Sequence, residues 1–301
     1  MDLLTSGGVI LVDKPTGPTS HDVVAVARRV LGTPRVGHAG TLDPLATGLL
    51  MLCVGPATRL VQFLVGLPKD YLARVRLGVR TTTDDPEGDV EATSEGWRDL
   101  DPGTLGAALS DLRGRTWQMP PRFSAKKIGG VAAHYRARRG EAVALAPVEV
   151  EVLDLELLEW QPPDLDLRVC CSSGTYVRAL ARDLGEALGT GAHLSALRRT
   201  AIGKFRVEGA VTLAGLGDPS LVERACMTPA AAVAHLPWVE VGPEDAVRIF
   251  QGQAIAFVGP VASSPLPDSP VAVLSGRTLI AVAEREEGRL RPRKVFPVKV
   301  S

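Results

Sequence analysis

The amino-acid sequence predicts an α+β fold with a mixed or antiparallel sheet, followed by a small β-rich C-terminal domain. Segments with a helical period and segments with a strand period are interspersed over about the first 235 residues. They lack the regular strand–helix alternation that is typical of a doubly wound parallel sheet. The last 60 or so residues contain short strands separated by turns, which favours a separate β-rich appendage.

The composition is that of a globular protein. The chain has 301 residues, of which 45% are hydrophobic and 23% charged, so we expect a packed core in one large domain or in a large and a small one. No apolar run approaches the roughly 20 residues that a transmembrane helix needs, and the N-terminus lacks the basic residues of a signal peptide. The four cysteines lack metal-ligand spacing and predict free thiols. These features predict a soluble, cytoplasmic protein.

The first third of the chain predicts three strands and two helices. The strands are residues 8–15, 49–55 and 71–80, and the helices are residues 19–32 and 57–67. Ser20 is the expected N-cap of the first helix, and Gly32 ends it. The strand at 71–80 alternates between an apolar face, which begins with Tyr71, and a face of arginines, so one side is expected to be buried.

The middle of the chain predicts a turn, two helices and three strands. The helices are residues 101–114 and 175–189, and the strands are residues 148–160, 165–171 and 192–205. The turn "TTTDDPEGD" holds four acids, Asp84, Asp85, Glu87 and Asp89, whose spacing does not fit a calcium loop. We therefore expect these acids to be solvated.

Basic residues are concentrated in two blocks, although the formal net charge is zero. Residues 113–139 contain eight lysines and arginines and no acid, with three aromatic residues among them. Residues 289–299 contain five bases and no acid. A single charge run is usually a solvated face, but two such blocks, one with interleaved aromatics, favour an RNA partner.

A lone carboxylate, Asp43, stands in the glycine-containing segment "GHAGTLDPLATG" at residues 37–48. A metal cage would need more ligands nearby, and a phosphate cradle would need a lysine after the glycines. On these residues alone, Asp43 could be a turn residue before a proline.

Several blocks in order carry a specific resemblance. "GVILVDKPTGPTSHDVV", "GHAGTLDPLATGLL", "KDYLARVRLG", "TTTDDPEG", "SSGTYVRALARDLGEALG" and "LSALRRTAIGKF" resemble the TruB family of pseudouridine synthases, which modify uridine-55 in the T loop of tRNA. The resemblance covers about residues 8–205 and implies a catalytic domain at 1–235 with an RNA-clamping basic insertion at 113–140. The tail resembles more loosely a PUA-type RNA-binding domain at 236–301.

The resemblance implies three catalytic residues. Asp43 corresponds to the family's catalytic aspartate, and Arg178 corresponds to the arginine that pairs with it and keeps it ionised. Tyr71 corresponds to the tyrosine that stacks on the flipped target base. Arg182, four residues before Glu186, is expected to be an ordinary solvated residue. Whether Asp43 attacks C1′, adds to C6 or assists a glycal-type path stays open.

The resemblance also implies substrate-binding residues and partners. His38 is expected to contact the T loop, Lys14 to brace the active-site loop, and Leu197 to line the base pocket. Arg59 and Arg199 are expected phosphate contacts. The implied partner is the T-arm of tRNA, with no metal, no cofactor, no membrane and no obligate protein partner, and the chain is expected to be a monomer. A guide-RNA-dependent pseudouridine synthase and a non-catalytic RNA-binding or RNA-folding protein on the same scaffold are the alternatives.

Overall fold

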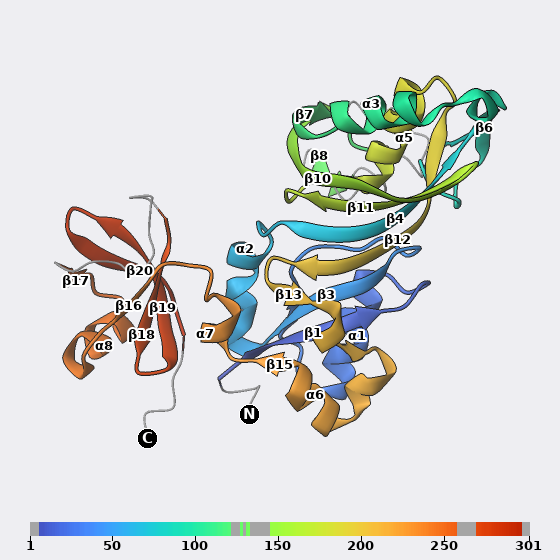
Figure 1. Ribbon diagram of the computed structural model, residues 1–301. Helices are drawn as coiled ribbons and strands as arrows, with labels where there is room; N and C mark the ends of the chain where they lie inside the picture. Colours follow the sequence, from blue (N-terminus) through green and yellow to red (C-terminus); the bar gives the residue numbers. More distant parts are fainter. Residues whose placement is uncertain (1–5, 122–126, 129–130, 133–144, 258–268, 297–301) are drawn as a thin grey trace. The chain divides into compact units, whose positions relative to one another are not determined.

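The computed structural model describes residues 6–121, 127–128, 131–132, 145–257 and 269–296, and the chain divides into two compact units (Figure 1). The first unit comprises Met1–Pro44, Gly48–Gly66 and Val207–Ser301, and the second comprises Leu45–Thr47 and Leu67–Arg206. Both contain helices and sheets, which confirms the α+β class. The expected domain boundary near residue 235 lies inside the first unit, so the division into a catalytic and a PUA-like domain stays a prediction.

The first unit is built around strand β1. This strand pairs antiparallel with β3 and β15 and parallel with β14, while β2 pairs antiparallel with β3, so the sheet is mixed. The bounds are β1 Gly8–Lys14, β2 Val36–His38, β3 Thr47–Val54, β14 Val211–Thr212 and β15 Cys226–Met227. β3 is almost wholly buried, as expected for the continuous apolar run at 49–55.

Helices α1 (Ser20–Val30) and α6 (Pro219–Ala225) cover one face of this sheet. The N-cap of α1 is Thr19 rather than the predicted Ser20, and it forms a capping box with Asp22. The predicted helix at 57–67 is a 3₁₀-helix, η1, followed by a single α-helical turn, α2. The remaining bounds are η1 Gly55–Leu60, α2 Val61–Leu64, η3 Val207–Gly209, η4 Ala214–Gly217 and α7 Pro229–Ala232.

The C-terminal part of the first unit forms a five-stranded sheet in the order β16-β18-β19-β20-β17. β16 and β18 are parallel and the other pairs are antiparallel. Helix α8 packs on it, and the two share a core that includes Ile249, Val273 and Leu290. The bounds are β16 Trp238–Glu240, α8 Pro243–Phe250, β17 Ile255–Ala256, β18 Val271–Ser275, β19 Thr278–Glu286 and β20 Arg289–Val295. The tail is therefore β-rich, as predicted.

The second unit contains an antiparallel sheet in the order β12-β4-β11-β10-β7 (Figure 1). The bounds are β4 Lys69–Leu77, β7 Gly114–Gln118, β10 Val148–Gln161, β11 Asp164–Cys171 and β12 Ala192–Ile202. β4 alternates between buried and exposed residues, as predicted. Shorter strands are β5 Val79–Thr81, β6 Val90–Thr93, β8 Lys127–Ile128, β9 Val131–Ala132 and β13 Phe205–Arg206.

Helix α5 (Val177–Ala187) packs against β12 and β4 in the second unit. A glycine permits this packing at close range, because a Cβ atom added at Gly185 would lie 2.2 Å from the backbone nitrogen of Ala192. Helix α3 (Pro102–Asp111), capped by Asp101, contacts α5 and β10, and η2 (Gly96–Asp99) precedes it. The position of α5 therefore depends on a residue without a side chain.

The structure also bears on two expectations from composition. Within the described residues, no helix is long and apolar enough to cross a membrane. All four cysteines are free thiols; Cys53 and Cys171 are buried, whereas Cys170 and Cys226 are partly exposed. Burial raises the pKa of the Cys53 thiol to about 12, so that thiol stays protonated and unreactive near neutral pH.

Candidate active site

Asp43 lies in the loop between β2 and β3, in the first unit, and its side chain is partly buried. The backbone on both sides of it is held in place. Ser20 Oγ donates a hydrogen bond to Leu42 O (3.1 Å) and accepts one from Leu42 N (2.8 Å). On the other side, Pro44 O accepts a hydrogen bond from Gly17 N at 2.9 Å. The carboxylate is therefore carried by a rigid loop, as a reacting group requires.

Lys14 contacts the same loop through its buried side chain. Its side chain is fully buried, and its Nζ atom donates hydrogen bonds to the carbonyl oxygens of Pro15 and Pro18, each at 2.8 Å. A third bond goes to Pro44 O at 3.3 Å. A buried ammonium is costly unless its donors have partners, and these carbonyls supply them. Because Lys14 is buried, its contribution is to the shape of the loop.

His38, at the end of β2, packs against a second histidine that sequence reasoning missed. The ring of His21, in the first turn of α1, lies edge-on to the His38 ring, with centroids 5.4 Å apart and an interplanar angle of 87°. His21 is exposed and His38 partly exposed. An edge-to-face contact of this kind favours one ring orientation over others.

Tyr71, Leu197 and Arg199 come together in the second unit. Tyr71 on β4 lies directly opposite Arg199 on β12, and Leu197 lies opposite Ala73 in the same pair of strands. Residues two apart on a strand share a face, so all three side chains belong to one face of the sheet. Tyr71 is 7% exposed and Arg199 is 1% exposed. The phosphate contact expected for Arg199 therefore finds no support in its position.

Arg178, on the first turn of α5, is held by an acid that the sequence reading placed in solvent. Its Nη1 atom lies 3.1 Å from Asp85 Oδ2 and donates a hydrogen bond to Thr83 O at 2.9 Å. The two charged side chains are 6% and 4% exposed. Glu87 N donates a hydrogen bond to the other oxygen of Asp85 at 3.0 Å. The prediction of a fully solvated turn is wrong for Asp85, because Asp85 neutralises a buried guanidinium.

Arg182, one helical turn further along α5, repeats this arrangement with Asp84. The side chains lie 3.2 Å apart and are 17% and 14% exposed, and Arg182 also contacts Asp183 at 2.7 Å. The prediction of an ordinary solvated arginine is therefore wrong. Burial raises the pKa of Asp84, and the Arg182 charge opposes this shift. Asp84 adopts a left-handed backbone (φ 59°), a conformation that aspartate tolerates better than most residues.

Lys69 is another buried cation, to which sequence reasoning assigned no role. It precedes Tyr71 by two residues on β4, is 6% exposed, and donates a hydrogen bond to Leu67 O at 2.7 Å. Burial lowers its pKa to about 8, and the nearby Arg199 charge adds to this effect. The signal was present in the sequence, because the apolar face of this strand begins with Tyr71 and the same alternation includes residue 69.

Arg59 and the basic insertion are the remaining predicted contacts. Arg59 is exposed, and its Nη1 atom donates a hydrogen bond to Val295 O at 2.5 Å. Much of the expected basic insertion at 113–140 lies outside the described residues. In its described part, Arg113 donates a hydrogen bond to Leu155 O, and Arg115 lies 3.7 Å from Glu151. The predicted phosphate role of Arg59 stays a prediction.

The two units divide the predicted catalytic and substrate-binding residues between them. Asp43, His38, Lys14 and Arg59 belong to the first unit, and Tyr71, Arg178, Leu197 and Arg199 belong to the second. The chain passes into the second unit directly after Pro44, at Leu45. Asp43 is thus two residues from that passage along the chain.

Comparisons with known proteins identify similar sequences and folds. Residues 28–177 match the model of the TruB family pseudouridylate synthase N-terminal domain, and residues 178–233 match that of the tRNA pseudouridylate synthase B C-terminal domain. The tRNA pseudouridine synthase B of Arthrobacter sp. is 44% identical over 96% of each chain. That of Thermobifida fusca is 44% identical over 96% of this chain and 98% of its own.

A solved structure with a similar fold is that of an H/ACA RNP bound to a substrate RNA containing 2′-deoxyuridine. It superimposes with a TM-score of 0.76 over 97% of this chain and 86% of that chain, at 28% identity. The likeness extends over nearly the whole chain, whereas the sequence is closer to the bacterial tRNA pseudouridine synthases.

Proposed function

The chain belongs to the TruB family of pseudouridylate synthases, which makes it an isomerase that modifies tRNA, and we propose that it converts uridine-55 of the T loop to pseudouridine. The reaction breaks the bond between ribose C1′ and N1 and forms a bond between C1′ and C5. The C5 proton is released and N1 gains one, so no electrons enter or leave. The chemistry needs an ionised carboxylate, a group that keeps it ionised, and a pocket for the detached base.

The rigid loop around Asp43 carries this proposal. Ser20 and Lys14 hold the backbone before and after it, so the carboxylate can meet the ribose or the ring without the cost of ordering a flexible loop. Arg178 supplies the positive charge in the proposed site, and Asp85 fixes the direction of its guanidinium. We propose that Arg178 acts as the cationic partner of Asp43 during catalysis, the role that the family resemblance implies for it.

The other predicted residues take supporting roles in this proposal. The ring of Tyr71 stacks on the flipped base, and Leu197 lines the apolar side of the base pocket. His38 contacts the T loop, with its ring orientation favoured by His21. Attack at C1′, addition to C6 and a glycal-type path are all compatible with a carboxylate so placed.

Tritium release tests the assignment. The substrate is unmodified tRNA labelled with tritium at C5 of its uridines, without metal or cofactor. We expect the parent protein to release about one equivalent, and Asp43→Asn to release none while it still binds tRNA, because the amide cannot act as a nucleophile. A tRNA with cytidine at position 55 should release none with either protein. Equal release by parent and variant would contradict the assignment.

The same assay separates the two alternatives. A guide-RNA-dependent enzyme would be inactive on bare tRNA and active only with a guide, whereas the proposed function requires activity without one. A non-catalytic RNA-binding protein would bind tRNA and release no tritium. The curated relatives, 44% identical along nearly the whole chain, favour the stand-alone tRNA enzyme over the H/ACA-type protein at 28%.

A further inference from the structure

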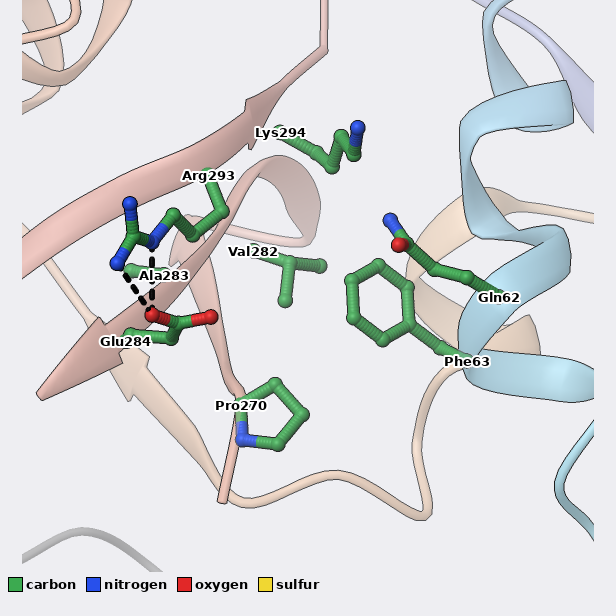
Figure 2. A pocket seen from close by; sticks show the side chains of 8 residues that line it. All are labelled: Gln62, Phe63, Pro270, Val282, Ala283, Glu284, Arg293 and Lys294. Carbon is green, nitrogen blue, oxygen red and sulfur yellow. Dashed lines mark hydrogen bonds and ion pairs between the residues drawn. The ribbon is translucent and has the colours of Figure 1, made fainter. Parts of the chain in front are cut away.

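A pocket of about 330 Å³ lies within the first unit, between α2 and the C-terminal sheet, and has no part in the site described above (Figure 2). Gln62 and Phe63 of α2 form one wall, and β19 and β20 form the other. Hydrogen bonds hold the walls in place. Phe63 O accepts one from His235 Nε2 at 3.0 Å, and Arg59 Nη1 donates one to Val295 O at 2.5 Å. This volume is at the lower end for small-molecule sites.

The pocket carries one positive charge that is not neutralised by a neighbour. The Arg293 guanidinium lies 2.7 Å from Glu284 and 2.8 Å from Glu286, so its charge is compensated. Lys294 follows it on β20 and lines the pocket, and it has no ion-pair partner among the residues that the structure describes. Its ammonium is therefore available to an anionic ligand.

The rest of the lining suits a flat, partly apolar group. The ring of Phe63 faces the pocket, with Val282 across from it and Pro270 beside it (Figure 2). The amide of Gln62 stands on the same side as Lys294, and it offers both hydrogen-bond donors and an acceptor. An aromatic face with an ammonium and an amide next to it is the combination by which proteins hold an unpaired base and its phosphate.

We propose that this pocket binds one unpaired nucleotide of the RNA substrate. The base stacks on Phe63, its edge reaches the Gln62 amide, and its phosphate lies on Lys294. A base inside a duplex has no free face, so a paired nucleotide cannot enter. The inference rests on the proposed function in that the RNA is tRNA, and it adds a contact away from the modified uridine.

The test combines affinity with chemical probing of the RNA on the full chain. Phe63→Leu removes the ring and Lys294→Gln removes the charge, while Phe63→Tyr keeps the ring. We expect the first two to bind unmodified tRNA at least about fivefold more weakly than the parent. Phe63→Leu loses base stacking, which contributes about 1–3 kcal/mol per base, and Lys294→Gln loses a charge contact to a phosphate. Phe63→Tyr should bind like the parent. Lys294→Gln should also reduce the slope of log affinity against log salt by about one.

Probing identifies the nucleotide. An unpaired base of tRNA should be protected from a base-modifying reagent by the parent and regain its reactivity with Phe63→Leu. Phe257→Leu, which changes another partly exposed phenylalanine of this unit outside the pocket, is the control and should leave that protection in place. Thermal unfolding of each variant shows whether a loss of affinity comes from misfolding. If Phe63→Leu is misfolded, the affinities of Phe63→Tyr and Lys294→Gln test the inference instead.

Three outcomes would overturn the inference: identical protection with parent and Phe63→Leu, an equal loss of affinity for a blunt RNA duplex, or unchanged affinity in both variants. Uridine and adenosine 5′-monophosphates test the source of the nucleotide. If they bind the parent and not Phe63→Leu while tRNA binding is unaffected, the pocket takes a free nucleotide and not the substrate. If the parent protein released no tritium, the proposed function would be contradicted instead. The proposed function and the pocket inference can therefore fail separately.

Discussion

Arg178 and Asp85 form a buried ion pair, so removal of one charge leaves the other buried without a charged partner. Asp85→Asn keeps the shape and one acceptor oxygen but removes the negative charge. We expect it to lower the free energy of unfolding by about 3 kcal/mol and to slow tritium release in single turnovers, because the guanidinium loses its fixed direction. Urea denaturation and quenched-flow tritium assays measure the two effects.

Glu87→Gln is the matched control for this prediction. Glu87 belongs to the same turn and has an exposed side chain, so its neutralisation changes the net charge equally without touching the ion pair. We expect it to behave like the parent protein in both measurements. Similar losses in the two variants would mean that the general charge of the turn matters rather than the pair.

Lys69 makes the stability of the second unit depend on pH. Its pKa is about 8 in the folded protein, below the ordinary value of 10.5, chiefly because of burial. Between these values the unfolded chain binds more protons than the folded one, so the free energy of unfolding rises with pH in this window. Below the window both states carry the proton, and the contribution of Lys69 no longer changes with pH. Relative to Lys69→Met, the parent should gain up to about 3 kcal/mol from pH 8 to 10.5.

Urea denaturation of parent and Lys69→Met at several pH values from 7 to 10.5 measures this difference. Parallel stability profiles over the whole range would show that Lys69 keeps its ordinary pKa.

The burial of Lys69 could be predicted from the sequence, whereas the burial of Asp85 could not. The strand alternation from residue 71 extends back to Lys69 and predicts its burial. Nothing in "TTTDDPEGD" distinguishes Asp85 from the exposed acids Glu87 and Asp89, since the partner of Asp85 lies 93 residues away.

At the scale of elements, periodicity predicted most strands and helices, while their ends followed from tertiary contacts. Ser20 satisfies the composition rule for an N-cap, but its hydroxyl bonds to Leu42, and Thr19 caps the helix instead. The predicted helix at 57–67 begins instead as the 3₁₀-helix η1, which starts at Gly55 and has Pro56 in its first turn. Local sequence predicts which segments form helices and strands, but it does not predict which of their side chains form hydrogen bonds with a distant loop.

The close packing of α5 against β12 can be tested by substitution of Gly185. Gly185→Ala would put a methyl group 2.2 Å from Ala192 N, which is backbone and cannot turn aside. We expect it to lower the free energy of unfolding by about 1–3 kcal/mol and to slow catalysis, since α5 carries Arg178. Gly106→Ala in α3 meets nothing within 4 Å and should instead stabilise by about 0.5–1 kcal/mol. Equal effects in urea denaturation would refute the packing argument.

Over the whole molecule, the sequence predicted where basic residues are concentrated, but it did not predict which of them are paired with acids. The arginines on the outer face of β4 pair with acids of β11, as Arg74 does with Asp166 at 2.7 Å. In the C-terminal block, Arg291 and Arg293 pair with acids of β19. Strand pairing decides these partners, and a linear sequence does not show it. Fewer of the exposed cations are therefore available to phosphates than the count of basic residues implies.

This difference leads to a prediction for the salt dependence of tRNA binding. Affinity should fall with salt, because each phosphate contact releases part of a condensed counterion, about 0.9 for duplex DNA and about 0.7 for a single strand. Lys126 and Lys127 belong to the basic block without acids, so changing both to Gln should reduce the slope by up to about two. Arg74→Gln, whose charge is already compensated, should leave the slope unchanged. Filter binding of tRNA from 50 to 300 mM salt, at about equal spacing, measures the three slopes. If Arg74→Gln reduces the slope as much as the lysine pair does, ion pairing within the sheet does not decide which cations meet the RNA.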